Sequence, residues 1–415
     1  MYKKEAVLIG AGKIGRGYMA YVFHKAGYKM TFLDYSDALI QKMNEQGYYT
    51  VFMQHREFGN GEITNFRIEG YEAYCTQTQY AQCVEVLSHA NYATVHVYPG
   101  AIQSIGKMIA DAAKKRMADG NTETLDVIFV INFLYADELF KKAALEALDT
   151  PEQKAYLEKY IGFVYGLVRG NGPTPNAEML AMDPIAVACA DSDYLPVDID
   201  QMKGPMPEGV NFHAAHNVGG LVKYKVWGGN VSHCANAYFG KERGYTYNYE
   251  SAQDAYIHKC AALCSREANH ALEQEVKVVP EERERYFGRH EEQRFDPEAV
   301  DTTIKDTLDR VGADPIRKLG RNDRFVGPAL LALHQGKVPF FLARGAAMGF
   351  YFTNPEDRAA CEIQEYIKEK GIEAAIIKYC QLDLSVREEN LLYQLILGNY
   401  WDISKQDPVD IHYCK

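Results

Sequence analysis

The chain has 415 residues, enough for two or three domains, and its apolar and charged fractions (47% and 24%) are ordinary for a globular protein. A net charge of −11 argues against a general nucleic-acid-binding protein, and no apolar run is long enough to span a membrane. The N-terminus lacks the apolar core of a signal peptide, and the nine cysteines contain no C-x-x-C pair. We therefore expect a reduced, cytoplasmic protein without a metal site.

The first forty residues have the pattern of a dinucleotide-binding βαβ unit. An apolar run over 5–9 predicts a buried strand, a glycine-rich turn and a helix follow, and a second strand ends at Asp34. In the turn, Gly10 permits tight chain reversal, Gly12 lets a pyrophosphate approach, and Gly15 lets the helix pack on the strand. Phosphates then bind at the helix N-terminus, and Asp34 accepts a ribose hydroxyl and repels a 2′-phosphate. We therefore predict NAD binding by Gly10, Ala11, Gly12, Lys13, Ile14, Gly15, Arg16 and Asp34.

The rest of the N-terminal half carries further strand patterns. Short apolar or β-branched runs predict strands over 48–52, 63–68, 93–98, 125–130, 162–168 and 184–190. Asn132 follows one of these strands, where ligands bind in open α/β sheets, so it is a candidate nicotinamide or substrate contact; a structural role is the alternative. A Pro/Gly cluster over 203–209 marks a boundary between a Rossmann-type domain, 1–204, and a second domain, 205–415.

Strand patterns almost disappear after that boundary. Helical periodicity dominates instead, so we predict an α/β first domain followed by an all-α second domain. The candidate helices cover residues 253–275, 298–311, 328–336, 356–370 and 386–398.

The second domain contains a K-x-x-x-x-N-x-x-H pattern made by Lys225, Asn230 and His233. On a helix, Asn230 and His233 share a face, and Lys225 lies about 80° from His233 around the axis. A lysine that loses its charge on burial can act as a general base, and Asn and His can hydrogen-bond a reacting oxygen. These are groups for removing a proton from an alcohol while a hydride leaves its carbon. The alternative is a solvated Lys, a capping Asn and a core His.

A basic cluster over 309–324 stands out in this acidic chain, with Arg294 upstream. The cluster is either a solvated face paired with acids or a pocket for a phosphate or polyhydroxylated anion. The second interpretation makes Arg294, Arg317 and Lys318 candidate substrate residues.

Three segments resemble one family, the polyol-specific long-chain dehydrogenases, also called the mannitol dehydrogenase family. These are the turn at 10–17, the motif at 225–233 and the run at 310–319, followed by Asp323-Arg324 and Gly327-Pro328. The third segment looks like the mannitol-1-phosphate 5-dehydrogenase branch. The resemblance implies an NAD-dependent, metal-independent enzyme that interconverts D-mannitol 1-phosphate and D-fructose 6-phosphate. It implies that Lys225 is the acid/base and that Asn230 and His233 hold the reacting oxygen.

The chain departs from that branch mainly on the substrate side. Ile131-Asn132 replaces a Glu-Asn pair, 168–173 replaces a D-R-I-V-P segment, and Tyr98-Pro99-Gly100 replaces a small-residue loop. Gly228-Gly229 replaces bulkier residues, and because glycine weakens a helix interior by about 1 kcal/mol, we expect Lys225 to precede the helix or lie on a flexible turn.

Two alternatives to a sugar-phosphate dehydrogenase therefore stay open. One is a hexuronate or non-phosphorylated polyol reductase on the same scaffold, and the other is an NAD(H) sensor that has lost catalysis. All three predict a small-molecule ligand and no nucleic-acid or membrane partner; the oligomeric state is open.

Overall fold

The computed structural model describes residues 4–55, 61–168, 174–192, 194–291 and 306–404. They form two compact units, Met1–Gly219 and Gly220–Lys415. None of the helices in these ranges combines the length and apolar character that a membrane span requires.

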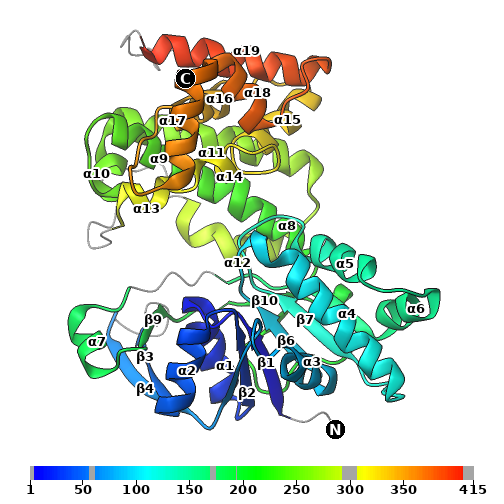
Figure 1. The fold of residues 1–415 in the computed structure, drawn as a ribbon. Coiled ribbons are helices and arrows are strands. Elements are labelled where there is room, and N and C mark those ends of the chain that lie inside the picture. The colour runs from blue at the N-terminus through cyan, green and yellow to red at the C-terminus, as the bar shows by residue number, and fades with distance from the viewer. Residues whose placement is uncertain (1–3, 56–60, 169–173, 193, 292–305, 405–415) are drawn as a thin grey trace. The chain divides into compact units, whose positions relative to one another are not determined.

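A six-stranded parallel sheet forms the centre of the first unit (Figure 1). Its strands lie in the order β5-β2-β1-β6-β7-β8, which is 3-2-1-4-5-6 when the sheet's own strands are counted along the chain. This is the order of dinucleotide-binding folds, in which ligands bind where the order reverses, here between β1 and β6. The bounds are Glu5–Ile9 (β1), Lys29–Asp34 (β2), Glu72–Cys75 (β5), Tyr92–Val95 (β6), Leu125–Phe129 (β7) and Ile161–Tyr165 (β8).

Helices connect these strands and cover the sheet (Figure 1). Close approach between two of them depends on Gly106, where a Cβ would lie 2.5 Å from the Cβ of Ala143 on the facing helix. A capping box between Thr150 and Gln153 begins another. The bounds are Ala20–Lys25 (α1), Asp37–Gln46 (α2), Tyr80–His89 (α3), Ile102–Ala118 (α4), Ala136–Glu146 (α5) and Pro151–Tyr160 (α6). A further helix, Ala177–Met182 (α7), follows β8 and does not lead to another strand of this sheet.

A smaller sheet in the order β4-β3-β9 lies beside the first (Figure 1). β3 (Tyr48–Gln54) pairs antiparallel with β4 (Ile63–Glu69) and parallel with β9 (Val187–Ala190). The strands predicted over 48–52 and 63–68 therefore form a hairpin.

The first unit continues beyond the boundary predicted at 204–205. β10 (Pro196–Asp198) pairs in parallel with β11 (His213–Ala215), and Val210 and Phe212 are buried in the core that underlies β1 and β2. The hydroxyl of Tyr92 also donates to the carbonyl of Pro205 (3.0 Å). Apolar burial and strand pairing thus keep the segment after the Pro/Gly cluster with the first unit.

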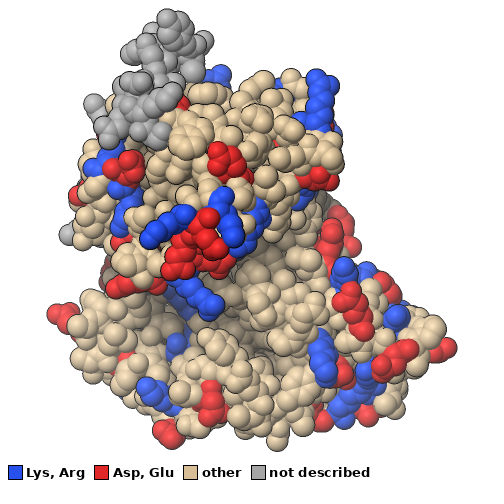
Figure 2. Space-filling view, turned by 45° about the horizontal axis from the view of Figure 1, so that its top comes forward, with Lys and Arg blue, Asp and Glu red and all other residues tan. Residues whose placement is uncertain are grey.

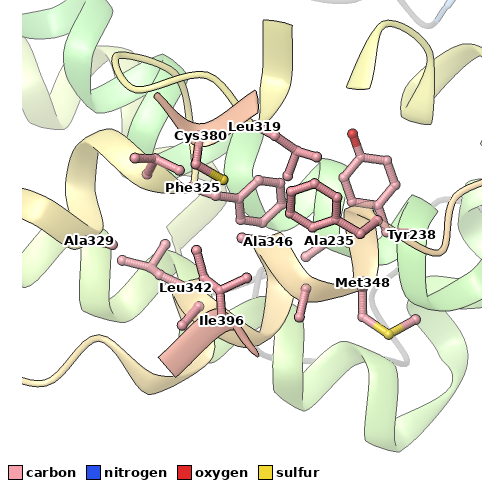
Figure 3. Packing of buried hydrophobic residues seen from close by; sticks show 14 of the residues in the cluster. Ala235, Tyr238, Leu319, Phe325, Ala329, Leu342, Ala346, Met348, Cys380 and Ile396 are labelled. Atoms are coloured by element: carbon pink, nitrogen blue, oxygen red, sulfur yellow. The ribbon is translucent and has the colours of Figure 1, made fainter. Parts of the chain in front are cut away.

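The second unit is helical, and the strand-like pairing in its described residues is an isolated bridge between Tyr247 and Thr307. Its core gathers side chains from α9, α11, α15, α16, α18 and α19; Figure 3 shows Tyr238 of α9 beside Phe325 and Leu319. A helix that begins in the last residues of the first unit, Val218–Lys223 (α8), leads into the second unit. The other bounds are Asn230–Glu242 (α9), Asn248–Gln253 (α10), Ala255–Glu275 (α11), Pro280–Glu291 (α12), Leu308–Gly312 (α13), Pro315–Lys318 (α14), Val326–His334 (α15), Phe340–Gly349 (α16), Arg358–Lys370 (α17), Ile372–Cys380 (α18) and Arg387–Ser404 (α19). The α/β unit followed by a helical unit confirms the predicted fold class.

Candidate active site

The glycine-rich turn lies at the carboxyl end of β1, and each predicted glycine has its own surroundings. Gly10 has φ +97°, and a Cβ there would lie 2.6 Å from the carbonyl oxygen of His96. At Gly15 a Cβ would lie 2.0 Å from the carbonyl oxygen of Gly10. At Gly12, by contrast, a Cβ would meet nothing within 4 Å, and Gly12 and Lys13 are exposed at the start of a helical turn. The turn therefore has two glycines that permit close packing and one that borders open space, as a phosphate cradle requires.

Asp34 lies at the end of β2, next to this turn. One of its carboxylate oxygens accepts from the backbone N–H of Ala11 (2.6 Å) and the other from that of Ser36 (2.9 Å). A carboxylate oxygen can accept more than one hydrogen bond, so Asp34 retains capacity for ribose hydroxyls. The same bonds hold the turn against the strand.

Arg16 uses its side chain inside the first unit. Its guanidinium donates to the carbonyls of Ala11 (2.6 Å) and Ile185 (2.5 Å) and lies over the ring of Tyr49. Burial lowers its pKa from the ordinary value. Any contact of Arg16 with a cofactor therefore falls to its backbone.

His96 is a residue that sequence reasoning missed. It follows β6, and its Nδ1 lies 3.0 Å from the position that a Cβ on Gly15 would take. Burial lowers the pKa of His96 to about 4, outweighing the backbone groups of Gly10 and Ile9, so the ring that supports the turn is neutral. The sequence feature that could have indicated this role is a histidine at the end of an otherwise mostly apolar strand. Asn132 is exposed just beyond β7, at the same edge of the sheet.

The motif of the second unit lies on a continuous helical segment that changes type. Residues Tyr224–Gly229 form a π-helix (η4) between α8 and α9, and the N–H of Asn230 donates to the carbonyl of Lys225. In an α-helix, two side chains that are five residues apart point in directions about 140° apart. In a π-turn the backbone hydrogen bond joins residues five apart, so their side chains lie on the same face. Lys225 and Asn230 therefore share one face, and His233 follows one turn later in α9.

The glycine pair in this segment does not interrupt the helix, so the expectation that Lys225 precedes the helix or lies on a flexible turn was wrong. A Cβ on Gly228 would lie 2.1 Å from Oδ1 of Asn269 on α11, and the carbonyl of Gly228 accepts from Ser265 (2.5 Å). The glycine is needed for close packing against α11. Its cost in helix propensity is offset by that packing.

The side chains of Asn230 and His233 differ in their surroundings. Asn230 is half-buried, and no hydrogen bond of its carboxamide is found among the described residues. Both ring nitrogens of His233 have neighbours: Nε2 lies 3.4 Å from the carboxylate of Asp306, and Nδ1 lies 3.2 Å from Nδ2 of Asn248. The adjoining faces of α9 carry Cys234, Ala235 and Tyr238 into the core, which leaves Asn230 and His233 on the less buried side of the helix.

The predicted substrate residues of the basic cluster are held by other protein groups. Arg317 pairs with Asp314 (2.9 Å) and Asp323 (3.0 Å). Lys318 is 5% exposed and donates to the carbonyl of Val311, and burial lowers its pKa to about 8. Arg294 lies outside the described residues.

Two more arginines complete the cluster. Arg321 binds both carboxylate oxygens of Glu389 (2.6 Å each), and buried Arg324 donates from Nε to Asp323 (2.7 Å). On the face drawn in Figure 2, acidic and basic side chains are likewise interspersed. Much of the cluster thus serves as an ion-pair network, the first of the two interpretations drawn from the sequence.

The cluster nevertheless contacts the motif. The indole N–H of Trp227, inside the π-turn, donates to the carbonyl of Asn322 (3.2 Å), and a Cβ on Gly327 would lie 2.6 Å from the same indole. The π-turn is therefore packed against the loop that contains Asn322 and the first turn of α15, within the second unit. Among the residues described, no group of three or more His, Cys, Asp or Glu could hold a metal ion.

Comparison with known proteins decides the family. Residues 4–208 match the model of the mannitol dehydrogenase Rossmann domain, and residues 218–395 match that of the mannitol dehydrogenase C-terminal domain. The chain belongs to the mannitol dehydrogenase family. It is an oxidoreductase, and the resemblance drawn from three segments is confirmed.

Curated relatives of this family member extend over nearly its whole length. A mannitol-1-phosphate 5-dehydrogenase of Thermoanaerobacter pseudethanolicus is 30% identical over 398 residues, covering 94% of this chain and 96% of the relative. The enzyme of the same name from Clostridium acetobutylicum is 31% identical over 405 residues, covering 97% and 100%.

Solved structures share the fold at lower identity. Mannitol 2-dehydrogenase of Pseudomonas fluorescens, in a ternary complex with NAD and D-mannitol, has a TM-score of 0.74 at 15% identity, covering 98% of this chain and 92% of that one. A D-sorbitol dehydrogenase in substrate-free form has a TM-score of 0.68 at 14% identity, covering 98% and 94%.

Proposed function

We propose that this mannitol dehydrogenase family member is an NAD-dependent enzyme that interconverts D-mannitol 1-phosphate and D-fructose 6-phosphate. The observation that carries the proposal is the hydrogen bond from the N–H of Asn230 to the carbonyl of Lys225. This bond puts residues 225 and 230 on one face of the helical segment, which supports the assignment of a lysine and a carboxamide to the same carbinol oxygen.

The cofactor side fits a dinucleotide. The space beside Gly12 is open and the helix that follows begins with exposed residues, so backbone N–H groups can meet a pyrophosphate. Asp34 supplies a negative charge next to the turn, which suits the ribose hydroxyls of NAD and disfavours the 2′-phosphate of NADP. NAD bound there would accept the hydride from the carbinol carbon.

The chain's own residues supply the rest of the chemistry. In the direction of alcohol oxidation, the amine of Lys225 takes the hydroxyl proton as the C–H bond breaks. The carboxamide of Asn230 donates to the oxygen as negative charge grows on it, and His233, one turn later on the same helical segment, supports that charge. Preorganised donors of this kind stabilise the transition state more than the substrate, which is the source of their rate effect.

The phosphate in the proposed substrate rests on the names of the relatives together with the third sequence segment. Arg310, Arg317, Lys318 and Arg324 concentrate positive charge in that segment. Carboxylate partners fix the three arginines in place, and the carbonyl of Val311 holds Lys318, so an anion that replaces a carboxylate would meet a preorganised set of donors.

The deciding experiment is NADH formation by the purified chain with NAD and D-mannitol 1-phosphate, with free mannitol and mannonate in parallel. The proposal predicts turnover on the phosphate that disappears in Lys225→Ala, while NADH binding is retained. Lys223→Ala is the matched control, because Lys223 lies two residues earlier on the same helical segment and outside the motif. Turnover only on an unphosphorylated substrate would support the hydride-transfer mechanism but refute the assignment of a phosphorylated substrate. If the protein binds NADH but turns over none of the three substrates, the alternative of an NAD(H) sensor that has lost catalysis would be favoured.

A further inference from the structure

His233 lies between two partners that the sequence places far from it. Nε2 lies 3.4 Å from Oδ2 of Asp306, and Nδ1 lies 3.2 Å from Nδ2 of Asn248. The two partners are tied to each other, because the N–H of Asn248 donates to the carbonyl of Asp306 (2.8 Å). A second backbone bond, from Leu308 to Thr246 (2.9 Å), extends this pairing. The ring is therefore held by one preformed unit.

The charge of Asp306 decides which ring nitrogen carries a proton. Burial raises the pKa of Asp306, but hydrogen bonds from His233 and Arg310 outweigh it and lower the pKa to about 2, so the carboxylate is ionised at neutral pH. An ionised carboxylate only accepts hydrogen bonds, so Nε2 of His233 must donate. In a neutral ring Nδ1 is then an acceptor, which suits the amide nitrogen of Asn248.

The carboxamide oxygen of Asn248 gives this side chain a second way to hydrogen-bond His233. Its Oδ1 is buried, and no hydrogen-bond partner for it is found in the described part of the chain. If the amide turned over, this oxygen would face Nδ1 and could accept from a protonated nitrogen, as an imidazolium requires. The same two side chains therefore fit both protonation states of the ring.

We propose that Asp306 and Asn248 are positioning residues that keep the proton of neutral His233 on Nε2 and let the ring take up a second proton on Nδ1. The proton comes from solvent, to which the His233 side chain is 45% exposed. Other charged groups nearby are Arg310, which pairs with Asp306, and Lys225, on the same helical segment. The proposal rests on the proposed function: because Asp306 and Asn248 occupy both ring nitrogens, His233 supports the developing alkoxide through the positive charge of its protonated ring and not through a hydrogen bond of its own.

The direct test is the tautomer of His233, measured by two-bond ¹H–¹⁵N correlation on protein labelled with ¹⁵N-histidine. The signals of His233 are assigned by their loss in His233→Gln. We expect the Nε2–H form in the wild-type protein at pH 8 and a mixture of tautomers in Asp306→Asn, because a carboxamide can donate as well as accept. The control is Asp309→Asn, which removes an acid three residues later that pairs with Lys241 (2.5 Å). A wild-type ring in the Nδ1–H form, or an unchanged spectrum in Asp306→Asn, would overturn the proposal.

Kinetics give a second measurement that a purely structural role would not move. In Asp306→Asn we expect kcat to fall about 10- to 100-fold, with KM and NADH binding nearly unchanged, because a misoriented ring loses interactions made only in the transition state. Asp306→Glu, which keeps the charge, should recover part of the rate. Equal losses in both variants would count against the charge argument. An inactive wild-type protein would defeat the proposed function, while the tautomer measurement would still judge this proposal.

Discussion

Gly12 and Gly15 lie three residues apart in one turn, and the structure predicts opposite consequences for the same substitution. In Gly15→Ala the new Cβ would lie 2.0 Å from the carbonyl oxygen of Gly10, a backbone atom that cannot rotate away. Overpacking costs roughly 1–3 kcal/mol, and a clash with backbone lies at the upper end of that range. Alanine recovers at most about 1 kcal/mol of helix propensity. We expect a net loss of roughly 2 kcal/mol in the stability of the first unit.

In Gly12→Ala the folded protein should be as stable as the wild type. The residue has φ −76°, which alanine adopts freely, and its Cβ would meet no atom within 4 Å. That Cβ would instead occupy the space that a pyrophosphate is expected to approach, so NADH should bind at least about tenfold more weakly.

The two variants are compared by calorimetry and by NADH fluorescence titration. For a unit of this size, a loss of 2 kcal/mol corresponds to a fall of roughly 4–8 °C in Tm. The expected pattern is a lower Tm in Gly15→Ala and an unchanged Tm with weakened NADH binding in Gly12→Ala. Wild-type NADH affinity in Gly12→Ala would mean that the phosphates bind elsewhere, and equal Tm values in both variants would refute the packing argument.

Three further predictions concern buried groups. Burial raises the pKa of Glu267 to about 7, above its value in an unfolded chain, so the stability that this group contributes at pH 4 is lost as pH rises through 7. The loss should be on the order of 3 kcal/mol, and calorimetry should find a flatter pH dependence in Glu267→Gln; parallel curves would contradict it. Arg116 is 0% exposed and donates to three backbone carbonyls, so Arg116→Met should lower Tm by several degrees, at roughly 2–4 kcal/mol; an unchanged Tm would show that water replaces the guanidinium. In Gly327→Ala the new Cβ would displace the indole of Trp227, so turnover should fall and tryptophan fluorescence emission should shift. Emission identical to that of the wild type would show that the backbone at residue 327 moves and the indole does not.

The cofactor half of the fold could be predicted because its signals are local. An apolar strand, three glycines and an acid follow one another within thirty residues, and each has one physical task. β5 was missed because Glu72–Cys75 has only four residues and begins with a charge, which leaves no run for a periodicity to appear. The second unit's candidate helices over 253–275, 328–336, 356–370 and 386–398 are confirmed within a few residues, apart from the longer C-terminal end of α19. Most of the helix predicted over 298–311 lies outside the described residues.

The candidate active site was harder to predict, because its partners are distant in the chain. Asn248 lies 15 residues from His233 on another helix, and Glu389 lies 68 residues from Arg321, so no periodicity within one helix connects the members of either pair. The basic cluster therefore left its two interpretations open. The alignment of Lys225 with Asn230 was also invisible to an α-helical periodicity, because it depends on a π-turn.

Because of that π-turn, the spacing between Lys225 and Asn230 matters as much as the identity of the residues in the motif. A π-turn is equivalent to one extra residue inserted into an α-helix, accommodated here where Gly228 packs against α11. Deleting any single residue between Lys225 and Asn230 would let the segment relax to a regular α-helix, with every amino acid of the motif still present. The lysine and the asparagine would then be four residues apart and still neighbours, but the segment between them would lose one position, so Trp227 and Gly228 could no longer both keep their present contacts with Asn322 and α11. Relatives that preserve the reaction should therefore tolerate substitutions within this segment far more readily than insertions or deletions.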